Sequence, residues 1–226
     1  MKTEIELAAP PDPVAVWRTV EEVERLLASE GSVTTGDRLT PRFRSMDFRD
    51  KRVVDLGCNI GYYSFLAGQL GARRVLGLDV GRGVVKVGAG LGRRHGAASV
   101  ELRVADFLAM EPPETFDVAL MIDVIGDNRV RNGRAGKMFD ALARFAAPVS
   151  VVAIRPVFYV EEHMGVSPGR LRGRYPEAFL DQGRLLFLEW VKAEYGRVWD
   201  IQGLTDHDDE QSVAKQMLRF TRKNDP

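Results

Sequence analysis

The sequence contains one cysteine, Cys58, among its 226 residues, so no disulfide can form within the chain. A zinc site would need other ligands, and these are grouped nowhere in the sequence. No stretch approaches the roughly 18 consecutive apolar residues of a membrane span, and the N-terminus lacks the apolar core of a signal peptide. These absences exclude disulfide-stabilised secreted proteins and integral membrane proteins. We therefore expect a soluble, cytoplasmic protein with no membrane partner.

An excess of charge of either sign is also missing. Lys and Arg together number 32, as do Asp and Glu, so the molecule as a whole has no net field that would attract a polyanion or an acidic membrane. This balance argues against non-specific nucleic-acid binding, although a local basic patch is still compatible with it. With 45% apolar residues, the chain can bury one core of substantial size.

The first 50 residues are predicted to form a helix followed by a lid or connecting segment. Asp12 is suited to cap the helix, Pro13 to its first position, and Gly31 to its end. Residues 32–50 are polar and basic and are interpreted as a connection. Its arginines are Arg38, Arg42, Arg44 and Arg49.

Residues 51–226 are predicted to form one α/β domain, because short apolar runs alternate with helical stretches from Lys51 onward. Helices are expected over 62–70, which ends before Gly71, and over 134–147, which ends before Pro148. Five strands are expected at 52–56, 74–79, 99–104, 116–122 and 149–154.

The last third of the chain is harder to divide. Residues 158–178 are rich in glycine, proline and arginine and are interpreted as a loop or a small excursion over the sheet, and a long helix is expected from about 176 to 195. Two further strands, 197–202 and 215–222, flank an acidic turn at 206–210 and would close the sheet as a hairpin. The predicted fold is thus a doubly wound, mostly parallel seven-stranded sheet with helices on both faces.

The most informative segment is VVDLGCNIGYYSF, residues 53–65, in which an apolar strand leads through a glycine turn into a helix. Open α/β sheets bind ligands beyond the carboxyl ends of their strands, so a nucleotide-like cofactor belongs at this turn. Gly57 allows the backbone to approach the ligand, and Gly61 allows the helix to pack closely. Asn59 between them tolerates a left-handed backbone.

Spacing and charge narrow the choice of cofactor. The dinucleotide fingerprint is G-x-G-x-x-G and holds a pyrophosphate anion, whereas here the two glycines are four residues apart. Asp55 stands two residues before Gly57, where it would repel a pyrophosphate and attract a cationic ammonium or sulfonium. The phosphate loop that ends in Lys followed by Ser or Thr is also absent.

This segment resembles motif I of the class I S-adenosylmethionine-dependent methyltransferases, D/E-x-G-x-G-x-G. Asp55, Gly57 and Gly61 match the motif, and Asn59 stands in place of its middle glycine. The likeness extends over the order of strands from about residue 51 to the C-terminus. The resemblance implies a Rossmann-like fold, S-adenosylmethionine as cofactor and methyltransferase activity.

The ends of the next three strands strengthen the resemblance. Asp79 lies 22 residues past Gly57, near where a carboxylate holds ribose hydroxyls in nucleotide-binding α/β folds. By the resemblance, Asp106 and Phe107 would contact the adenine, and Asp123 would lie in motif IV beside the methionine part. A single strand-terminal aspartate is often only a helix cap or turn residue. Four in succession favour a donor site, for which the expected residues are Asp55, Gly57, Cys58, Asn59, Gly61, Asp79, Asp106, Phe107 and Asp123.

A general base would assist transfer to a hydroxyl or a protonated nitrogen. Asp123, Asp127, Tyr159 and His163 come from segments expected at the mouth of the site. His163 is the first choice among them and Asp123 the second. A solvent-exposed loop histidine is the alternative reading of His163, and the aspartates could equally line the donor pocket or cap a helix.

The acceptor is less well specified. The D/N-P-P-Y/F signature of amino-methylating DNA enzymes is absent after the fourth strand, where IDVIGDN stands. A small molecule, methylated on oxygen or nitrogen, is the leading hypothesis. RNA is the second, because basic loops beside a neutral body could clamp a phosphate backbone. Arg170, Arg172 and Arg174 alternate in a segment read as extended, so they would face one side and could receive a phosphate or a carboxylate, although such a run is more commonly a solvated loop. A non-catalytic domain that binds S-adenosylmethionine or a partner is the third.

Overall fold

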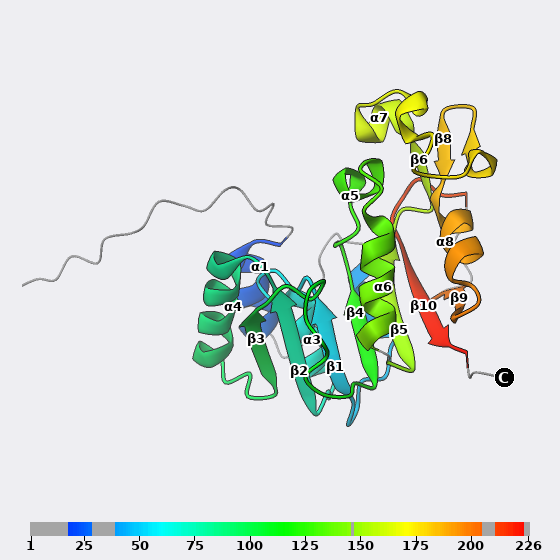
Figure 1. The fold of residues 1–226 in the computed structure, drawn as a ribbon. Helices are drawn as coiled ribbons and strands as arrows, with labels where there is room; N and C mark the ends of the chain where they lie inside the picture. Colours follow the sequence, from blue (N-terminus) through cyan, green and yellow to red (C-terminus); the bar gives the residue numbers. More distant parts are fainter. Residues whose placement is uncertain (1–17, 29–38, 146, 205–210, 224–226) are drawn as a thin grey trace, which may run out of the picture.

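The computed structural model describes residues 18–28, 39–145, 147–204 and 211–223. At its centre is a seven-stranded sheet (Figure 1). Strand β10 runs antiparallel to both its neighbours, β5 and β9, and the other neighbouring pairs are parallel. The predicted sheet is therefore confirmed. Its strands in spatial order are β3 (Val100–Val104), β2 (Arg74–Asp79), β1 (Arg52–Leu56), β4 (Val118–Met121), β5 (Val149–Ile154), β10 (Gln216–Arg222) and β9 (Trp199–Gly203).

Helices cover both faces of the sheet, as expected. Val54 and Leu56 of β1 belong to an apolar cluster shared with α6 (Ala135–Phe145) and α8 (Phe187–Tyr195). Val53 belongs to a second cluster, shared with α1, α3 and α4. Successive side chains of a strand point to opposite faces, so a strand buried on both faces is apolar without alternation. The helices of the second face are α1 (Val20–Ala28), α2 (Leu39–Arg44), α3 (Tyr62–Gln69) and α4 (Arg82–Arg94).

The segment between α1 and β1 differs from the prediction. Part of the helix expected over 12–31 lies outside the described residues, and its described part is α1. The connection expected over 32–50 contains α2, in which Leu39 and Phe43 are buried, and Phe48 after it is buried too. Leu39 and Phe43 are four residues apart and so share one face of a helix, although the arginines around them suggested a solvated linker.

The segment after β5 was also predicted wrongly. Residues 157–186, which we call the insertion, form a three-stranded sheet of β6 (Val157–Tyr159), β8 (Arg184–Leu186) and β7 (Leu180–Asp181). Helix α8 therefore begins at Phe187, not at 176. The physical reason is a two-residue hairpin turn at Gln182 and Gly183, whose φ values of 44° and 80° end any helix there. The insertion also contains α7 (Val160–Met164) and the 3-10 turns η1 (Pro168–Leu171) and η2 (Glu177–Phe179).

The insertion lies beyond the carboxyl ends of β4 and β5, next to the short helix α5 (Asp127–Arg131) (Figure 1). This places it on the side of the sheet where ligands bind in open α/β folds. The longest described helix, α4, has 13 residues, and within the described part of the chain none is long and apolar enough to span a bilayer.

Candidate functional site

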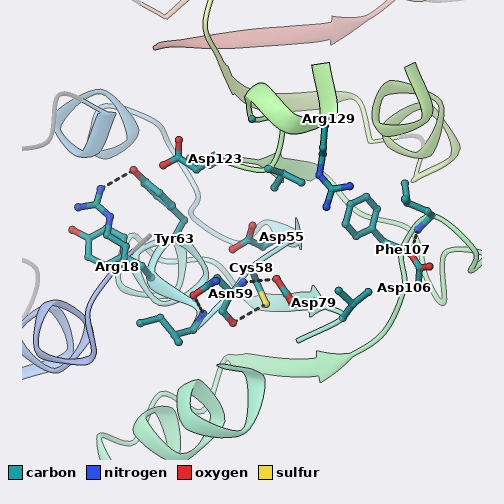
Figure 2. A pocket seen from close by; sticks show the side chains of 18 of the residues that line it. Arg18, Asp55, Cys58, Asn59, Tyr63, Asp79, Asp106, Phe107, Asp123 and Arg129 are labelled. Carbon is teal, nitrogen blue, oxygen red and sulfur yellow. Dashed lines mark hydrogen bonds between the residues drawn. The ribbon is translucent and has the colours of Figure 1, made fainter. Parts of the chain in front are cut away.

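A cavity of about 680 Å³ opens at the carboxyl ends of the parallel strands (Figure 2). The four strand-end carboxylates, Asp55, Asp79, Asp106 and Asp123, all line it. The structure thus brings together side chains spread over nearly 70 residues of sequence. Of the other residues expected at a donor site, those that also line the cavity are Gly57, Cys58, Asn59 and Phe107.

The glycine turn has the backbone that was expected of it. Gly57 has φ of 82°, and a Cβ atom there would clash with the adjacent Val124, whose Cγ2 would lie 2.6 Å away. Asn59 has φ of 52°, and its side-chain oxygen accepts a hydrogen bond of 2.9 Å from the Ile60 N–H. Gly61 does not line the cavity. A Cβ there would meet Leu102 of β3 at 2.7 Å, so its role is close packing.

Asp79 is held rigidly at the end of β2. One carboxylate oxygen accepts a hydrogen bond of 2.9 Å from the Asn59 N–H, and the other accepts one of 2.7 Å from the Gly81 N–H. Each oxygen has a second lone pair, so the carboxylate can still accept hydroxyl groups of a ligand. The turn after β1 and the end of β2 are thereby locked into one unit that faces the cavity.

Asp55 is the most buried of the four carboxylates, with 3% of its surface exposed. It accepts a hydrogen bond of 2.6 Å from the Ser64 hydroxyl, and no cationic side chain pairs with it among the described residues. Burial raises the pKa of Asp55 to about 7. A buried acid that faces a cavity without a countercharge fits a positively charged ligand such as a sulfonium. Burial also raises the pKa of the neighbouring Cys58 thiol, which keeps it protonated.

The segment after β3 carries Asp106 and Phe107. Asp106 accepts a hydrogen bond of 2.9 Å from the Leu108 N–H, which is the ordinary turn role of an aspartate, and it also lines the cavity. Phe107 is buried in the core cluster with its ring at the cavity edge. Arg144 of α6 donates to the carbonyls of Phe107 and Leu108, at 2.9 and 3.0 Å, and fixes this edge.

Asp123 follows β4 with a left-handed backbone, φ 60°. Its carboxylate accepts a hydrogen bond of 2.5 Å from Nζ of Lys215, which stands just before β10. Asp123 lines the cavity, both side chains are partly exposed, and the pair ties the ends of two strands that are not neighbours in the sheet. Lys215 was not foreseen, because nothing in the sequence links it to Asp123.

The structure does not bring His163 to the cavity. Its Nδ1 accepts a hydrogen bond of 2.9 Å from the Tyr159 N–H, and its Nε2 lies 3.3 Å from a guanidinium nitrogen of Arg155. Tyr159 and Asp127 are likewise not among the described residues that line the cavity. His163 lies on α7 and Tyr159 at the end of β6, both in the insertion, where the two residues bind each other, whereas Asp127 is the first residue of α5.

Two further sides of the cavity were missed by sequence reasoning. On one side the Arg18 guanidinium lies 4.4 Å from the centre of the Tyr62 ring and donates a 3.1 Å hydrogen bond to the Tyr63 hydroxyl. On the other side Arg129 and Arg134 come from α5 and the turn after it. Arg18 is distant in sequence from the glycine turn, and α5 was not predicted, so no local pattern pointed to these arginines.

Residues 47–161, just over half of the chain, match the model of a family described as a methyltransferase domain. The chain belongs to this family. S-adenosylmethionine is therefore the cofactor of the domain, as the glycine turn and its acidic neighbour indicated. The buried Asp55, which has no cationic partner among the described residues, and the left-handed backbone of Gly57 at the cavity are features of this chain that fit the cofactor.

Curated relatives of this methyltransferase domain resemble it over parts of their length. Ribosomal protein L11 methyltransferase of Shewanella sediminis is 32% identical over 78 residues, which is 34% of this chain and 26% of that protein. The tRNA U34 carboxymethyltransferase of Campylobacter hominis is 50% identical over 36 residues, which is 16% of this chain and 13% of that protein. The chain thus spans less than half the length of these relatives.

Solved structures share the fold of the methyltransferase domain at low identity. Magnesium protoporphyrin IX methyltransferase from Synechocystis, with bound S-adenosylmethionine, superposes with a TM-score of 0.50 at 15% identity and covers 90% of this chain and 78% of its own. The bifunctional kinase-methyltransferase WbdD superposes with a TM-score of 0.52 at 19% identity, over 77% of this chain and 35% of its own.

Proposed function

We propose that this methyltransferase domain methylates an oxygen or nitrogen atom of a small molecule. The observation that carries the proposal is the single cavity in which the strand-end carboxylates and the arginine-bearing sides face one another. Its volume of about 680 Å³ lies within the range typical of small-molecule sites. Donor and acceptor would share this one space, with the donor against the strand ends.

The donor supplies a methyl group on a sulfonium, a good leaving group, so the protein has chiefly to hold the reactants in line. The carboxylate of Asp79 is suited to accept the ribose hydroxyls, and Asp106 with Phe107 to contact the adenine. Asp55 stands where it would favour the positive charge of the donor. Asp123, oriented by Lys215, is the cavity residue placed to take the proton that the acceptor loses.

Calorimetry tests the donor site directly. The parent chain is titrated with S-adenosylmethionine, S-adenosylhomocysteine and NAD, and so is the Asp79→Ala variant. We expect the two adenosyl compounds to bind the parent and the variant to bind them at least tenfold more weakly, because two hydrogen-bond acceptors at the ribose position are lost. Preferential binding of NAD would overturn the assignment. Donor binding with no turnover on any acceptor would favour a non-catalytic domain.

RNA is the second candidate acceptor. It is favoured by the exposed arginines of the insertion, Arg170, Arg172 and Arg174, which lie beyond the strand ends. However, the segment is not continuously extended as predicted, because Arg170 lies in the 3-10 turn η1. Arg172 pairs with Glu177 at 3.5 Å, and Arg174 donates to the Arg131 carbonyl. The three therefore do not form one uniform basic face. RNA binding that falls steeply with salt concentration would support this candidate over the first.

A further inference from the structure

The charges that line the cavity are divided between its sides. The strand ends contribute Asp55, Asp79 and Asp106, which form an acidic floor. The side formed by α5 and the turn after it, residues 126–134, contributes Arg129 and Arg134 and no cavity-lining acid. We call this side the α5 wall. A cationic donor is attracted to the floor and repelled by the α5 wall, so the wall faces a different ligand.

Neither arginine of the α5 wall has a side-chain partner among the residues that the structure describes. The side chains of two nearby arginines do have hydrogen-bond partners, which are backbone carbonyls. Arg131 donates to the Met164 carbonyl at 3.1 Å, and Arg174 donates to the Arg131 carbonyl. Arg129 is half-buried and extends from α5 toward the cavity, beside Phe107 (Figure 2). A guanidinium has five N–H donors and no acceptor, so one that is partly removed from water calls for an anion.

The insertion holds the α5 wall in place. The Tyr175 hydroxyl donates a buried hydrogen bond of 2.8 Å to the Val130 carbonyl, between the two arginines in sequence. The Arg174 side chain also packs over Gly133, whose missing Cβ would lie 3.5 Å from it. The backbone from which Arg129 and Arg134 project is therefore fixed before any ligand arrives, which lowers the cost of binding one.

S-adenosylmethionine also has a carboxylate, which could pair with an arginine of the α5 wall. The cavity offers this carboxylate a different partner, Arg18. Arg18 lies on the side of the cavity opposite Arg129, next to the glycine turn and Tyr63 (Figure 2). A donor with its adenine at Asp106 and its ribose at Asp79 would direct its amino-acid end toward Arg18. It would bring only its neutral adenine near Arg129, so the α5 wall would remain available to an anion of the acceptor.

We infer that Arg129 and Arg134 recognise an anionic group of the acceptor, a phosphate or a carboxylate. The inference rests on the proposed function, since it takes the acidic floor as the donor site. A guanidinium pairs with either anion through two parallel N–H donors, which fixes orientation as well as charge. The acceptor class is accordingly a phosphorylated or carboxylated compound whose nucleophile reaches Asp123 while its anion rests on the α5 wall.

The test uses the full chain saturated with S-adenosylhomocysteine and titrated with inorganic phosphate, acetate and a short single-stranded RNA. The variants are Arg129→Gln, Arg129→Lys and Arg134→Gln, and the control is Arg93→Gln, an exposed arginine on α4. We expect phosphate or acetate to bind the parent and the control equally. Each glutamine variant should weaken that binding at least fivefold, and Arg129→Lys should weaken it less.

The outcomes distinguish an RNA acceptor from a small-molecule acceptor. They also distinguish failure of the anion site from failure of the proposed function. RNA that competes with phosphate and binds much more tightly would identify the anion as a nucleic-acid phosphate, and phosphate or acetate alone would identify a small acceptor. Unchanged anion binding in both glutamine variants would overturn the inference. So would weaker S-adenosylhomocysteine binding in Arg129→Gln, because Arg129 would then belong to the donor site. A parent chain that binds no adenosyl compound would instead overturn the proposed function.

Discussion

The four strand-end aspartates show how one residue type acquires different properties from its surroundings. Asp79 is held by two backbone N–H groups, Asp106 caps its own turn, and Asp123 is paired with Lys215. Asp55 has only the Ser64 hydroxyl and is buried. Burial raises the pKa of Asp55 to about 7, so its ionisation falls in the range where small changes of pH matter.

This difference predicts that donor binding depends on pH through Asp55. A cationic ligand favours the ionised carboxylate, so affinity for S-adenosylmethionine should rise from pH 6 to pH 8 and level off above the pKa of about 7. Near pH 7 binding should release about half a proton, measurable by calorimetry in buffers of different ionisation enthalpy. Asp55→Asn should abolish both effects, whereas Asp200→Asn on the exposed strand β9 should retain them. A pH-independent affinity in the parent would contradict this role.

The ionisation of Asp55 also makes the folded state less stable as pH rises, whereas most acids, whose pKa is lowered by folding, make it more stable. Its pKa in the folded chain lies above the ordinary value of 3.8, so the folded state binds more protons between these values and loses stability as pH rises toward 7. The difference between these two pKa values corresponds to a loss of folding stability of about 4 kcal/mol at most. Above pH 7 the ligand-free Asp55→Asn variant should therefore unfold at a higher temperature than the parent.

The acidic floor could be predicted from sequence, whereas the arginines could not. Asp55 and Asp79 directly end apolar runs, and parallel strands bring such ends together without further information. Arg18 and Arg129 enter the cavity only because α1 packs on α3 and because the insertion holds α5. Those placements depend on contacts between distant segments, which no local pattern encodes.

At the scale of elements, α5 is too short to be stable by itself and depends on the insertion. Its five residues form barely more than one helical turn, well below the length at which isolated helices persist. Hydrogen bonds from Tyr175 and Arg174, together with the one that Arg131 donates to Met164, join it to the insertion. The insertion thus sets the position of one side of the cavity although its own residues do not line it.

Removing one of these hydrogen bonds should therefore weaken binding of the acceptor and leave binding of the donor unchanged. Tyr175→Phe deletes the hydroxyl that binds the Val130 carbonyl, at a cost of about 1 kcal/mol. We expect KM for the acceptor to rise severalfold while the Kd of S-adenosylhomocysteine stays the same. Tyr195→Phe is the matched control, because its hydroxyl binds the Gly136 carbonyl on α6 instead. Equal effects of both variants on acceptor KM would contradict the role of the insertion.

The elements that sequence predicted best are those fixed by local pattern. The bounds of β1, β2 and β5 match the prediction to the residue, because each is a short apolar run with a clear start and end. The hairpin of β7 and β8 was taken for part of a helix, since Phe179, Leu186, Trp190 and Val191 were read as one inward helix face. Its turn at Gln182 and Gly183 was the signal that was overlooked.

At the scale of the whole molecule, the N-terminal segment is part of the core. Val23 and Leu26 of α1 and Phe43 of α2 belong to the same apolar cluster as Val53 and Leu66. The division at residue 50 expected from sequence stays a prediction, and the segments on its two sides share this packing. A lid that opens at residue 50 would expose the cluster to water, which is costly.

Phe43 tests this packing. It is fully buried and stacks on Phe48 at 4.8 Å between ring centres, with Tyr63 at 5.1 Å. Phe43→Ala should lower the free energy of unfolding by about 3–5 kcal/mol in urea denaturation. Val87→Ala on the exposed side of α4 should change it by less than about 0.5 kcal/mol. A loss below about 1 kcal/mol for Phe43→Ala would mean that the segment is a loosely attached lid.

The uneven charge of the cavity has a consequence for turnover. When the methyl group leaves, the sulfur becomes neutral, so the spent cofactor has less attraction to Asp55 and Asp79 than the fresh one. The acidic floor would then discriminate between them by charge alone. At a pH where Asp55 is ionised, the fresh cofactor should accordingly bind more tightly than the spent one, which favours their exchange after each cycle.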